Sequence, residues 1–251
     1  MPLDVDQINS RLPDRLIFWM EQTDSTMLDG ARLAAGGCPS GTVVGAESQT
    51  AGQGRQGRSW HSEKDTGLYF SVVLWAPLPP EDLPVVTLAA GLAVAEAITQ
   101  VTGLAVDLRW PNDVIIDGRK ACGILIQQHH QALVAGFGLN VNHTAFPGEI
   151  AGLATSLRMA AGREFAREQL LVAILEALDR HLDILTSQGK DAVLRLFSRA
   201  SSYVTGRRVV VEQGGPPLRG VTAGLDPNGF LILRQDDGAR TLILAGGVRP
   251  E

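Results

Sequence analysis

Ser48-Gln49-Thr50-Ala51-Gly52-Gln53-Gly54-Arg55-Gln56-Gly57-Arg58-Ser59-Trp60 is the stretch around which the chain is organised, because it separates two expected strands, Thr42 to Glu47 and Leu68 to Trp75. Three glycines alternate with two arginines, and no apolar side chain between Ala51 and Trp60 can anchor the segment, which predicts a mobile surface loop. Glycine lets backbone N–H groups approach an anion, and the guanidinium groups add charge. The loop therefore predicts a ligand that carries phosphate or carboxylate.

Two familiar phosphate-binding motifs do not describe this loop. No Gly-Lys-Ser/Thr follows the glycines, so it is not a Walker loop, and it is not a Gly-x-Gly-x-x-Gly motif at a strand-to-helix turn. A flexible basic linker is the structural alternative to a ligand-binding loop.

Composition narrows the class of protein. The chain has 251 residues, 45% of them hydrophobic, and a net charge of −5, which allows one large or two unequal domains and argues against a surface that coats nucleic acid. Cys38 and Cys122 have no metal-ligand spacing and favour free thiols in a reducing compartment. The N-terminal residues contain Asp4 and Asp6 and no long apolar run, so we expect a cytoplasmic protein without a signal peptide or membrane span.

Most of the chain alternates between helical and strand patterns. Asp82 to Thr102 is the clearest helix, because Pro84 lies in its first turn and Gly103 ends it. Further elements are expected as strands at 17–19 and 132–142 and as helices at 26–35, 166–186 and 190–200. A composition shift near Val204 introduces short β-runs and turns, which predict a small β-barrel appended to the α/β body.

The segment from Val106 to Ile126 places polar groups at the end of a strand. Pro111 stops the first strand and leaves the short polar side chains of Asn112 and Asp113 at its end, and the Asp117-Gly118 turn then predicts a β-hairpin. In the simplest register Lys120 lies close to Asp113. A solvated surface lysine is the alternative, but the small residues Ala121-Cys122-Gly123 beside it would let a ligand approach the strand.

Other polar residues have a structural and a functional interpretation. Asp24-Ser25 at a helix start predicts an N-cap, while the Ser25-Thr26 hydroxyls and nearby N–H groups could also face a ligand. Asn140 and Asn142 alternate with apolar residues, so we expect both amides on one side of a strand end, as ligand-binding or turn-forming groups. The histidines show no metal-ligand pattern, and we expect them to be surface or incidental residues: His61, His129, His130, His143 and His181.

With these segments placed, the chain resembles the biotin protein ligases from about Thr23 to Arg249. Five motifs carry the resemblance in the right order: Asp24-Ser25-Thr26, the Gly52–Trp60 loop, Arg109-Trp110-Pro111-Asn112-Asp113, Arg119-Lys120-Ala121-Cys122-Gly123-Ile124-Leu125, and Gly138-Leu139-Asn140-Val141-Asn142. The resemblance implies an α+β fold. It comprises a mixed β-sheet catalytic domain with flanking helices (1–203), of the class II synthetase-like, biotin/lipoate ligase type, and a small C-terminal SH3-like β-barrel (204–251).

The resemblance also implies a two-step reaction, in which ATP activates biotin to biotinyl-5′-AMP and an acceptor lysine then takes the biotin. Lys120 would bridge the two anions, Arg55 and Arg58 would fold over the phosphates, and Asp113 would orient the lysine or face Mg²⁺. Biotin's ureido ring would meet Ser25, Thr26 and Gln49, while Trp60 and Asn140 would bracket the adenine. The implied catalytic set is Lys120, Arg55, Arg58 and Asp113, and the implied ligand-binding set is Ser25, Thr26, Met27, Gln49, Gly52, Gln53, Gly54, Arg55, Gly57, Trp60, Lys120, Gly123 and Asn140.

The implied ligands are ATP, biotin and Mg²⁺, and the implied partner is the biotin carboxyl carrier protein of acetyl-CoA carboxylase. Only about twenty residues precede the first motif, too few for the N-terminal winged helix-turn-helix of some members, so we expect no DNA binding. We also expect no membrane contact, and a monomer or weak homodimer. Two residues depart from the family pattern: Gln53 replaces a loop arginine, and Arg109 replaces a lysine. A lipoate–protein ligase and a non-catalytic biotin-sensing module are the alternative functions.

Overall fold

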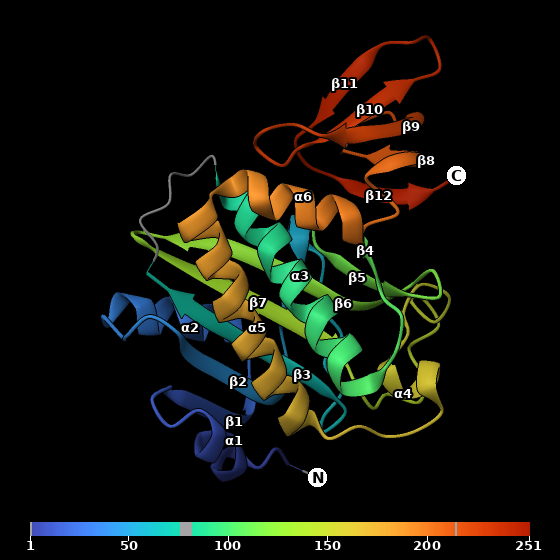
Figure 1. Ribbon diagram of the computed structural model, residues 1–251. Coiled ribbons are helices and arrows are strands. Elements are labelled where there is room, and N and C mark those ends of the chain that lie inside the picture. The colour runs from blue at the N-terminus through green and yellow to red at the C-terminus, as the bar shows by residue number, and fades with distance from the viewer. Residues whose placement is uncertain (1, 76–81, 214) are drawn as a thin grey trace.

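A seven-stranded mixed sheet forms the body of the protein in the computed structural model, which describes residues 2–75, 82–213 and 215–251 (Figure 1). The strand order is β1-β2-β3-β7-β6-β5-β4, with β1 parallel to β2 and the other neighbours antiparallel. The strands are β1 (Ile17–Thr23), β2 (Thr42–Gln49), β3 (Gly67–Leu74), β4 (Asp107–Arg109), β5 (Asp113–Ile116), β6 (Arg119–His129) and β7 (Ala132–Asn140).

Helices cover both faces of this sheet. On one face lie α3 (Leu83–Thr102) and α5 (Arg167–Gln188), which pack against each other, with α6 (Lys190–Ala200) beside them (Figure 1). On the other face lies α2 (Thr26–Ala35), against β2, β3 and β7. Two short helices, α1 (Val5–Arg11) and α4 (Leu157–Ala161), were not expected from the sequence.

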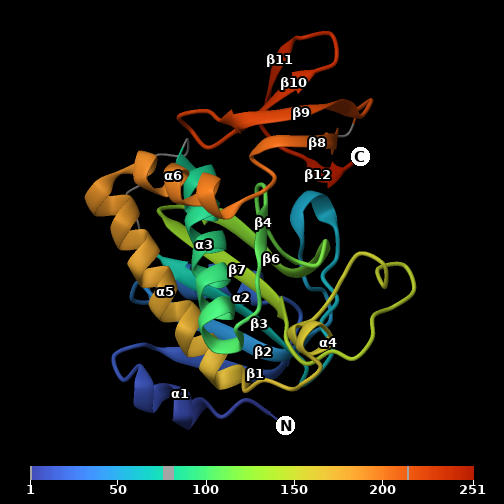
Figure 2. The same cartoon turned by 45° about the vertical axis from the view of Figure 1, so that its right-hand side comes forward.

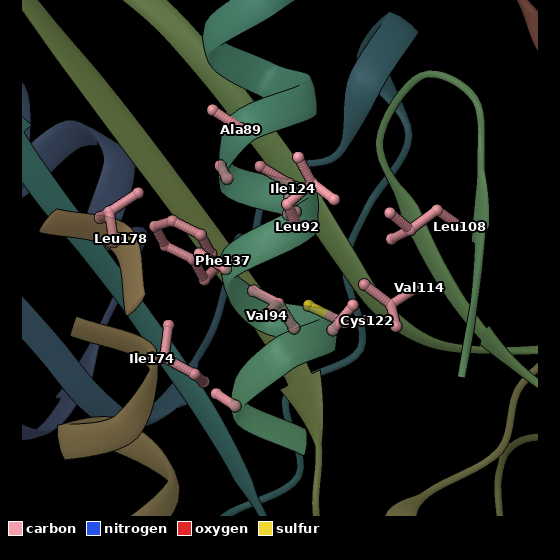
Figure 3. Close-up of a cluster of buried hydrophobic side chains, with 14 of the residues drawn as sticks. Ala89, Leu92, Val94, Leu108, Val114, Cys122, Ile124, Phe137, Ile174 and Leu178 are labelled. Atoms are coloured by element: carbon pink, nitrogen blue, oxygen red, sulfur yellow. The ribbon is translucent and has the colours of Figure 1, made fainter. Parts of the chain in front are cut away.

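The alternation of side chains along β7 explains this arrangement. Phe137 points towards α3 and α5 and joins the main hydrophobic core (Figure 3). Gly136 and Gly138 point the other way, where Met27 of α2 and Trp60 lie directly against them. One strand therefore supplies both the core and the floor of a polar site.

Helix α3 is apolar on nearly all sides because the sheet, α5 and α6 surround it. It begins with Pro84 in its first turn and ends at Gly103, whose φ of 75° provides the left-handed C-cap, as predicted. Among the described residues it is the one helix long and apolar enough to cross a membrane by length and composition, and most of that stretch is buried inside the protein.

The predicted hairpin is present. Asp117 and Gly118 have φ values of 49° and 76°, as a tight two-residue turn requires, and they pair Ile115 with Lys120. Lys120 shares a face with Asp113 because its partner Ile115 does, whereas the register shift between Val114 and Ile115 is a bulge that brings Gly123 opposite Asp113, a departure from the simplest register.

A second, five-stranded antiparallel sheet follows α6. Its order is β11-β10-β9-β8-β12, and its strands are β8 (Thr205–Glu212), β9 (Leu218–Leu225), β10 (Leu231–Gln235), β11 (Arg240–Ile243) and β12 (Gly247–Pro250). Four of these strands correspond to predicted β-runs, whereas β12 was missed. The sheet lies next to the β4–β5 end of the first sheet, where the indole N–H of Trp110 donates to the Gly229 carbonyl (2.9 Å).

Candidate active site

Lys120, Asp113 and Arg109 form a compact charged group at the end of the hairpin. The Lys120 Nζ lies 2.6 Å from Asp113 Oδ1, while Arg109 donates to Oδ2 through Nε (3.2 Å) and Nη2 (2.8 Å). Burial alone would raise the pKa of the Asp113 carboxyl, but the charges of Lys120 and Arg109 and their hydrogen bonds outweigh it and hold this pKa below its ordinary value. The predicted proximity of Lys120 and Asp113 is confirmed.

Two glycines beside this group, Gly123 and Gly138, leave room for the Trp60 ring on the surface of the sheet, which forms the floor of the site. A Cβ at Gly138 would lie 2.3 Å from Trp60 Cε2, and one at Gly123 would lie 2.7 Å from Trp60 Cζ3 and 2.8 Å from Lys120 Nζ. Only glycine at these two positions lets the indole lie flat across β6 and β7. The Lys120 Nζ lies 5.1 Å from the centre of the Trp60 ring, and the indole Nε1 is buried without a hydrogen-bond partner among the described residues.

Polar groups at the start of α2 line the inner end of the pocket. Gln49 Oε1 accepts from the Thr26 backbone N–H (2.9 Å) and hydroxyl (3.2 Å), and Ser71 donates to the Thr26 hydroxyl (3.0 Å). Ser25 occupies the N-cap position but makes no capping hydrogen bond, which corrects the capping interpretation, because Gln49 takes that role. The Ser25 hydroxyl is fully buried and has no partner among the described residues.

The Gly/Arg loop folds back on itself. Gly54 N–H donates to the Arg58 carbonyl (2.7 Å), Trp60 N–H donates to the Gly52 carbonyl (2.8 Å), and Gln53 pairs with Ser59. At its tip is a short 3₁₀ turn, η1 (Arg55–Gly57), beside β6 and near β12 (Figure 2). Within it Gln56 and Gly57 have φ values of 58° and 71°, a backbone that glycine adopts without strain.

The two loop arginines lie in different surroundings. Arg55 Nη1 donates to Asn112 Oδ1 (2.8 Å) and to the Gly246 carbonyl (3.4 Å), and burial lowers the pKa of its guanidinium from the ordinary value. Arg58 is exposed over 60% of its side chain and lies 4.0 Å from Glu212 of β8. Arg55 is therefore held inside the site, whereas Arg58 lies at its rim.

The two asparagines at the end of β7 do not act as a pair. Asn140 is buried and donates from Nδ2 to the Thr155 carbonyl (3.0 Å), next to a large cleft. Asn142 lies beyond the end of the strand and exchanges two hydrogen bonds with the Phe165 backbone. Asn140 therefore lines the cleft, whereas Asn142 fixes the backbone just before α5.

Two adjoining pockets meet at Lys120. The inner pocket is lined by Thr26, Met27, Gln49, Gln53 and Gly123, among others, and the outer cleft by Arg58, Arg109, Asp113 and Asn140, among others. Gly54, Arg55, Trp60, Asn112 and Lys120 line both. Nothing in the sequence indicated two further segments that line the outer cleft, one with Phe146, Ile150 and Leu153 and the other residues 246–250.

Two histidines contradict the expectation that all five are surface or incidental. His143 is completely buried, with Nε2 3.0 Å from both the Tyr69 hydroxyl and the Thr66 hydroxyl, and its ring stacks on Phe146. Burial, with a smaller effect of His61, lowers the pKa of His143 to about 4. His181 is also buried and lies 2.9 Å from Glu96 Oε2.

Asp113 is also the carboxylate that the sequence suggested for Mg²⁺. No group of three or more His, Cys, Asp or Glu among the described residues could hold a metal ion, and both Asp113 oxygens already face cations. Asp113 therefore fits the role of a lysine-orienting carboxylate better than that of a metal ligand.

Comparisons with known proteins agree with the geometry. The biotin/lipoate A/B protein ligase family profile matches residues 19–142, and the biotin protein ligase C-terminal domain profile matches residues 204–248. The chain is 34% identical to the biotin–[acetyl-CoA-carboxylase] ligase of Mycobacterium tuberculosis, over 98% of this chain and 94% of that protein. It is 32% identical to the bifunctional ligase/repressor BirA of Bacillus subtilis, over 91% and 72%. The biotin protein ligase of Aquifex aeolicus in complex with biotin and ATP superposes with a TM-score of 0.83 at 30% identity, covering 94% of this chain and 99% of that one.

Proposed function

Because the chain belongs to the biotin protein ligase family, we propose that it attaches biotin to a lysine of a biotin carboxyl carrier protein in two steps driven by ATP. The observation that carries the proposal is Lys120, a cation at the junction of an inner pocket and a larger outer cleft. The relatives named above are biotin ligases, so a lipoate ligase is the less favoured function.

In the first step a carboxylate oxygen of biotin attacks the α-phosphorus of ATP. One P–O bond forms, the bond to the β-phosphate breaks, and pyrophosphate leaves with its charge. Two anions have to meet, so the site must neutralise both and hold them in line. Lys120 lies where its ammonium can contact both groups, and Arg55 adds a second, partly buried cation next to it.

The inner pocket suits biotin. Thr26 and Gln49 offer hydrogen bonds for the ureido ring, as does the adjacent Ser25 hydroxyl, which has no partner in the described part of the chain. Met27 and the glycine-lined floor provide an apolar wall for the rest of the molecule. The outer cleft suits the nucleotide, with the Trp60 ring available for stacking and Asn140 at its edge.

In the second step the amine of the acceptor lysine attacks the carbonyl carbon of biotinyl-5′-AMP. The C–N bond forms, the bond between the acyl carbon and the phosphate oxygen breaks, AMP leaves and the amine loses a proton. We propose that the Gly52–Trp60 loop keeps water away from this anhydride, and that residues 204–251, as a separate SH3-like domain, close the cleft above it.

The test is biotin transfer by the purified chain to a purified carrier domain of an acetyl-CoA carboxylase, with biotin, ATP and magnesium. We expect label on one lysine of the carrier, dependent on ATP, and no label when that lysine is replaced by arginine. Tight biotin binding without transfer or ATP consumption would instead support a biotin-sensing module.

A further inference from the structure

Lys120 is not free in this structure. Its Nζ lies 2.6 Å from Asp113 Oδ1, yet the proposed reaction requires the same ammonium to face a carboxylate and a phosphate. An isolated Lys–Asp pair carries no net charge, and its carboxylate would compete with the substrate anions for the lysine ammonium. The contact between Lys120 and Asp113 therefore has to be weak enough to be exchanged during each turnover.

Arg109 provides a physical means to weaken it. Its Nε and Nη2 both donate to Asp113 Oδ2, the oxygen that Lys120 does not contact, and Arg109 and Asp113 are direct partners in the β4–β5 ladder. The two side chains are only 17% and 16% exposed, so solvent screens their interaction little. With two cations on one carboxylate, the group keeps one net positive charge for an incoming anion.

The other charged groups around Asp113 also leave a net positive charge there. Besides Arg109 on β4 and Lys120 on β6, Arg55 on the Gly/Arg loop interacts electrostatically with Asp113. The nearby Cys122 thiol is buried, which raises its pKa to about 12, so it adds no negative charge near neutral pH. Asp113 is thus a single carboxylate facing three cations.

The backbone on both sides of Arg109 is fixed. Ser201 donates through its hydroxyl to the Leu108 carbonyl (2.5 Å), and Trp110 donates through its indole N–H to the Gly229 carbonyl (2.9 Å). Arg109 is held between these two hydrogen bonds, one to the end of α6 and one to the C-terminal sheet. Its position next to Asp113 is therefore a property of the packed fold.

We infer that Arg109 is a positioning residue that neutralises Asp113 and so frees Lys120 to contact the substrates. The inference rests on the proposed function for its catalytic meaning. Whether Arg109 weakens the Lys120–Asp113 ion pair can be measured without biotin.

The experiment is competitive labelling of amines with an acetylating reagent, followed by mass spectrometry. The chain has three lysines, Lys64, Lys120 and Lys190, so the rate of Lys120 can be read against two internal standards. In Arg109→Ala the Lys120 ammonium is more tightly paired with Asp113 and less available to the reagent, so we expect Lys120 to label more slowly by roughly tenfold. Arg109→Lys should restore most of the rate, and Asp113→Asn should raise it.

Kinetics provide the second readout. Arg109→Ala should lower kcat for biotin-dependent pyrophosphate exchange by roughly tenfold with little change in the KM for biotin. In an Asp113→Asn background, removing Arg109 should have no further effect, because there is no carboxylate left to neutralise. Arg180→Ala is the matched control: it removes an arginine that pairs with Glu96 far from the site and should change neither readout.

Unchanged or faster labelling of Lys120 in Arg109→Ala would overturn the inference, as would independent effects of the Arg109 and Asp113 substitutions. Should Arg109→Ala not fold, Arg109→Gln removes the charge, keeps part of the side-chain volume and carries the same expectation. If the unmodified chain shows no biotin-dependent exchange, the proposed function fails, and the labelling rates still decide the inference.

Discussion

Gly138→Ala tests whether Trp60 has to lie flat on the floor of the site. The new Cβ would be 2.3 Å from Trp60 Cε2 and 2.5 Å from its Nε1, whereas ordinary contacts begin near 3.4 Å. Gly138 lies in β7, paired on one side with Tyr69 of β3 and on the other with Gly123 of β6, so its backbone cannot retreat. The indole must therefore move by about an ångström or more.

Gly138→Ala should impair nucleotide binding more than it lowers the free energy of unfolding. Trp60 belongs to a loop and can shift, so we expect the free energy of unfolding to fall by only about 1 kcal/mol, at the low end of overpacking. Stacking of a base on an aromatic ring contributes about 1–3 kcal/mol, so the KM for ATP should rise roughly tenfold to a hundredfold. Pyrophosphate exchange, calorimetric biotin binding and thermal unfolding measure these effects.

Two controls sharpen this test. Gly91→Ala makes the same change inside α3, where the added Cβ meets its nearest neighbour, Phe197, at an ordinary 3.6 Å, so activity should be normal. In a Trp60→Ala background Gly138→Ala should have little further effect, because the obstructing ring is gone. Near-normal KM and unfolding temperature in Gly138→Ala alone would refute this account of the floor.

Further substitutions test other parts of the site. Lys120→Ala should lower adenylation by about a hundredfold to a thousandfold, the usual cost of losing one group that stabilises transition-state charge, while circular dichroism stays normal; near-wild-type turnover would contradict this role. Arg55→Gly should release biotinyl-5′-AMP and label bystander proteins, whereas labelling confined to the carrier would count against it. The folded-state pKa of His143, about 4, lies below its unfolded value, so its contribution to stability is complete above about pH 6.5 and is lost as the pH falls towards 4. In His143→Gln the free energy of unfolding, measured with denaturant, should therefore depend less on pH: between pH 7 and pH 5 its slope should fall by up to about 1.4 kcal/mol per pH unit. An unchanged slope would contradict the assignment.

Local sequence signals predicted the parts of the site that depend on short-range geometry. The Asp117-Gly118 turn determines which residues face each other in the β5–β6 hairpin, and so it brings Lys120 to Asp113. The bulge that brings Gly123 opposite Asp113 has no marker in the sequence beyond the small residues Ala121, Cys122 and Gly123. The small residues Ala121-Cys122-Gly123 indicated a close approach, whereas Gly138 was not interpreted in this way, and the ring that both glycines accommodate comes from a distant loop.

The features that were missed depend on contacts between distant parts of the chain. Gln49 takes the capping role from Ser25 because β2 ends beside the start of α2, which no local pattern reveals. His143 is buried because Tyr69 and Thr66 reach its ring from β3 and the turn before it. Residues 246–250 reach the cleft from the second sheet, and nothing in those residues alone indicates a ligand.

The most direct test of the central claim is ATP–pyrophosphate exchange by the purified chain, with biotin and with lipoate in parallel. The account predicts exchange that depends on biotin, is absent with lipoate, and is lost in Lys120→Ala. Exchange with lipoate alone, or no exchange despite tight biotin binding, would contradict it.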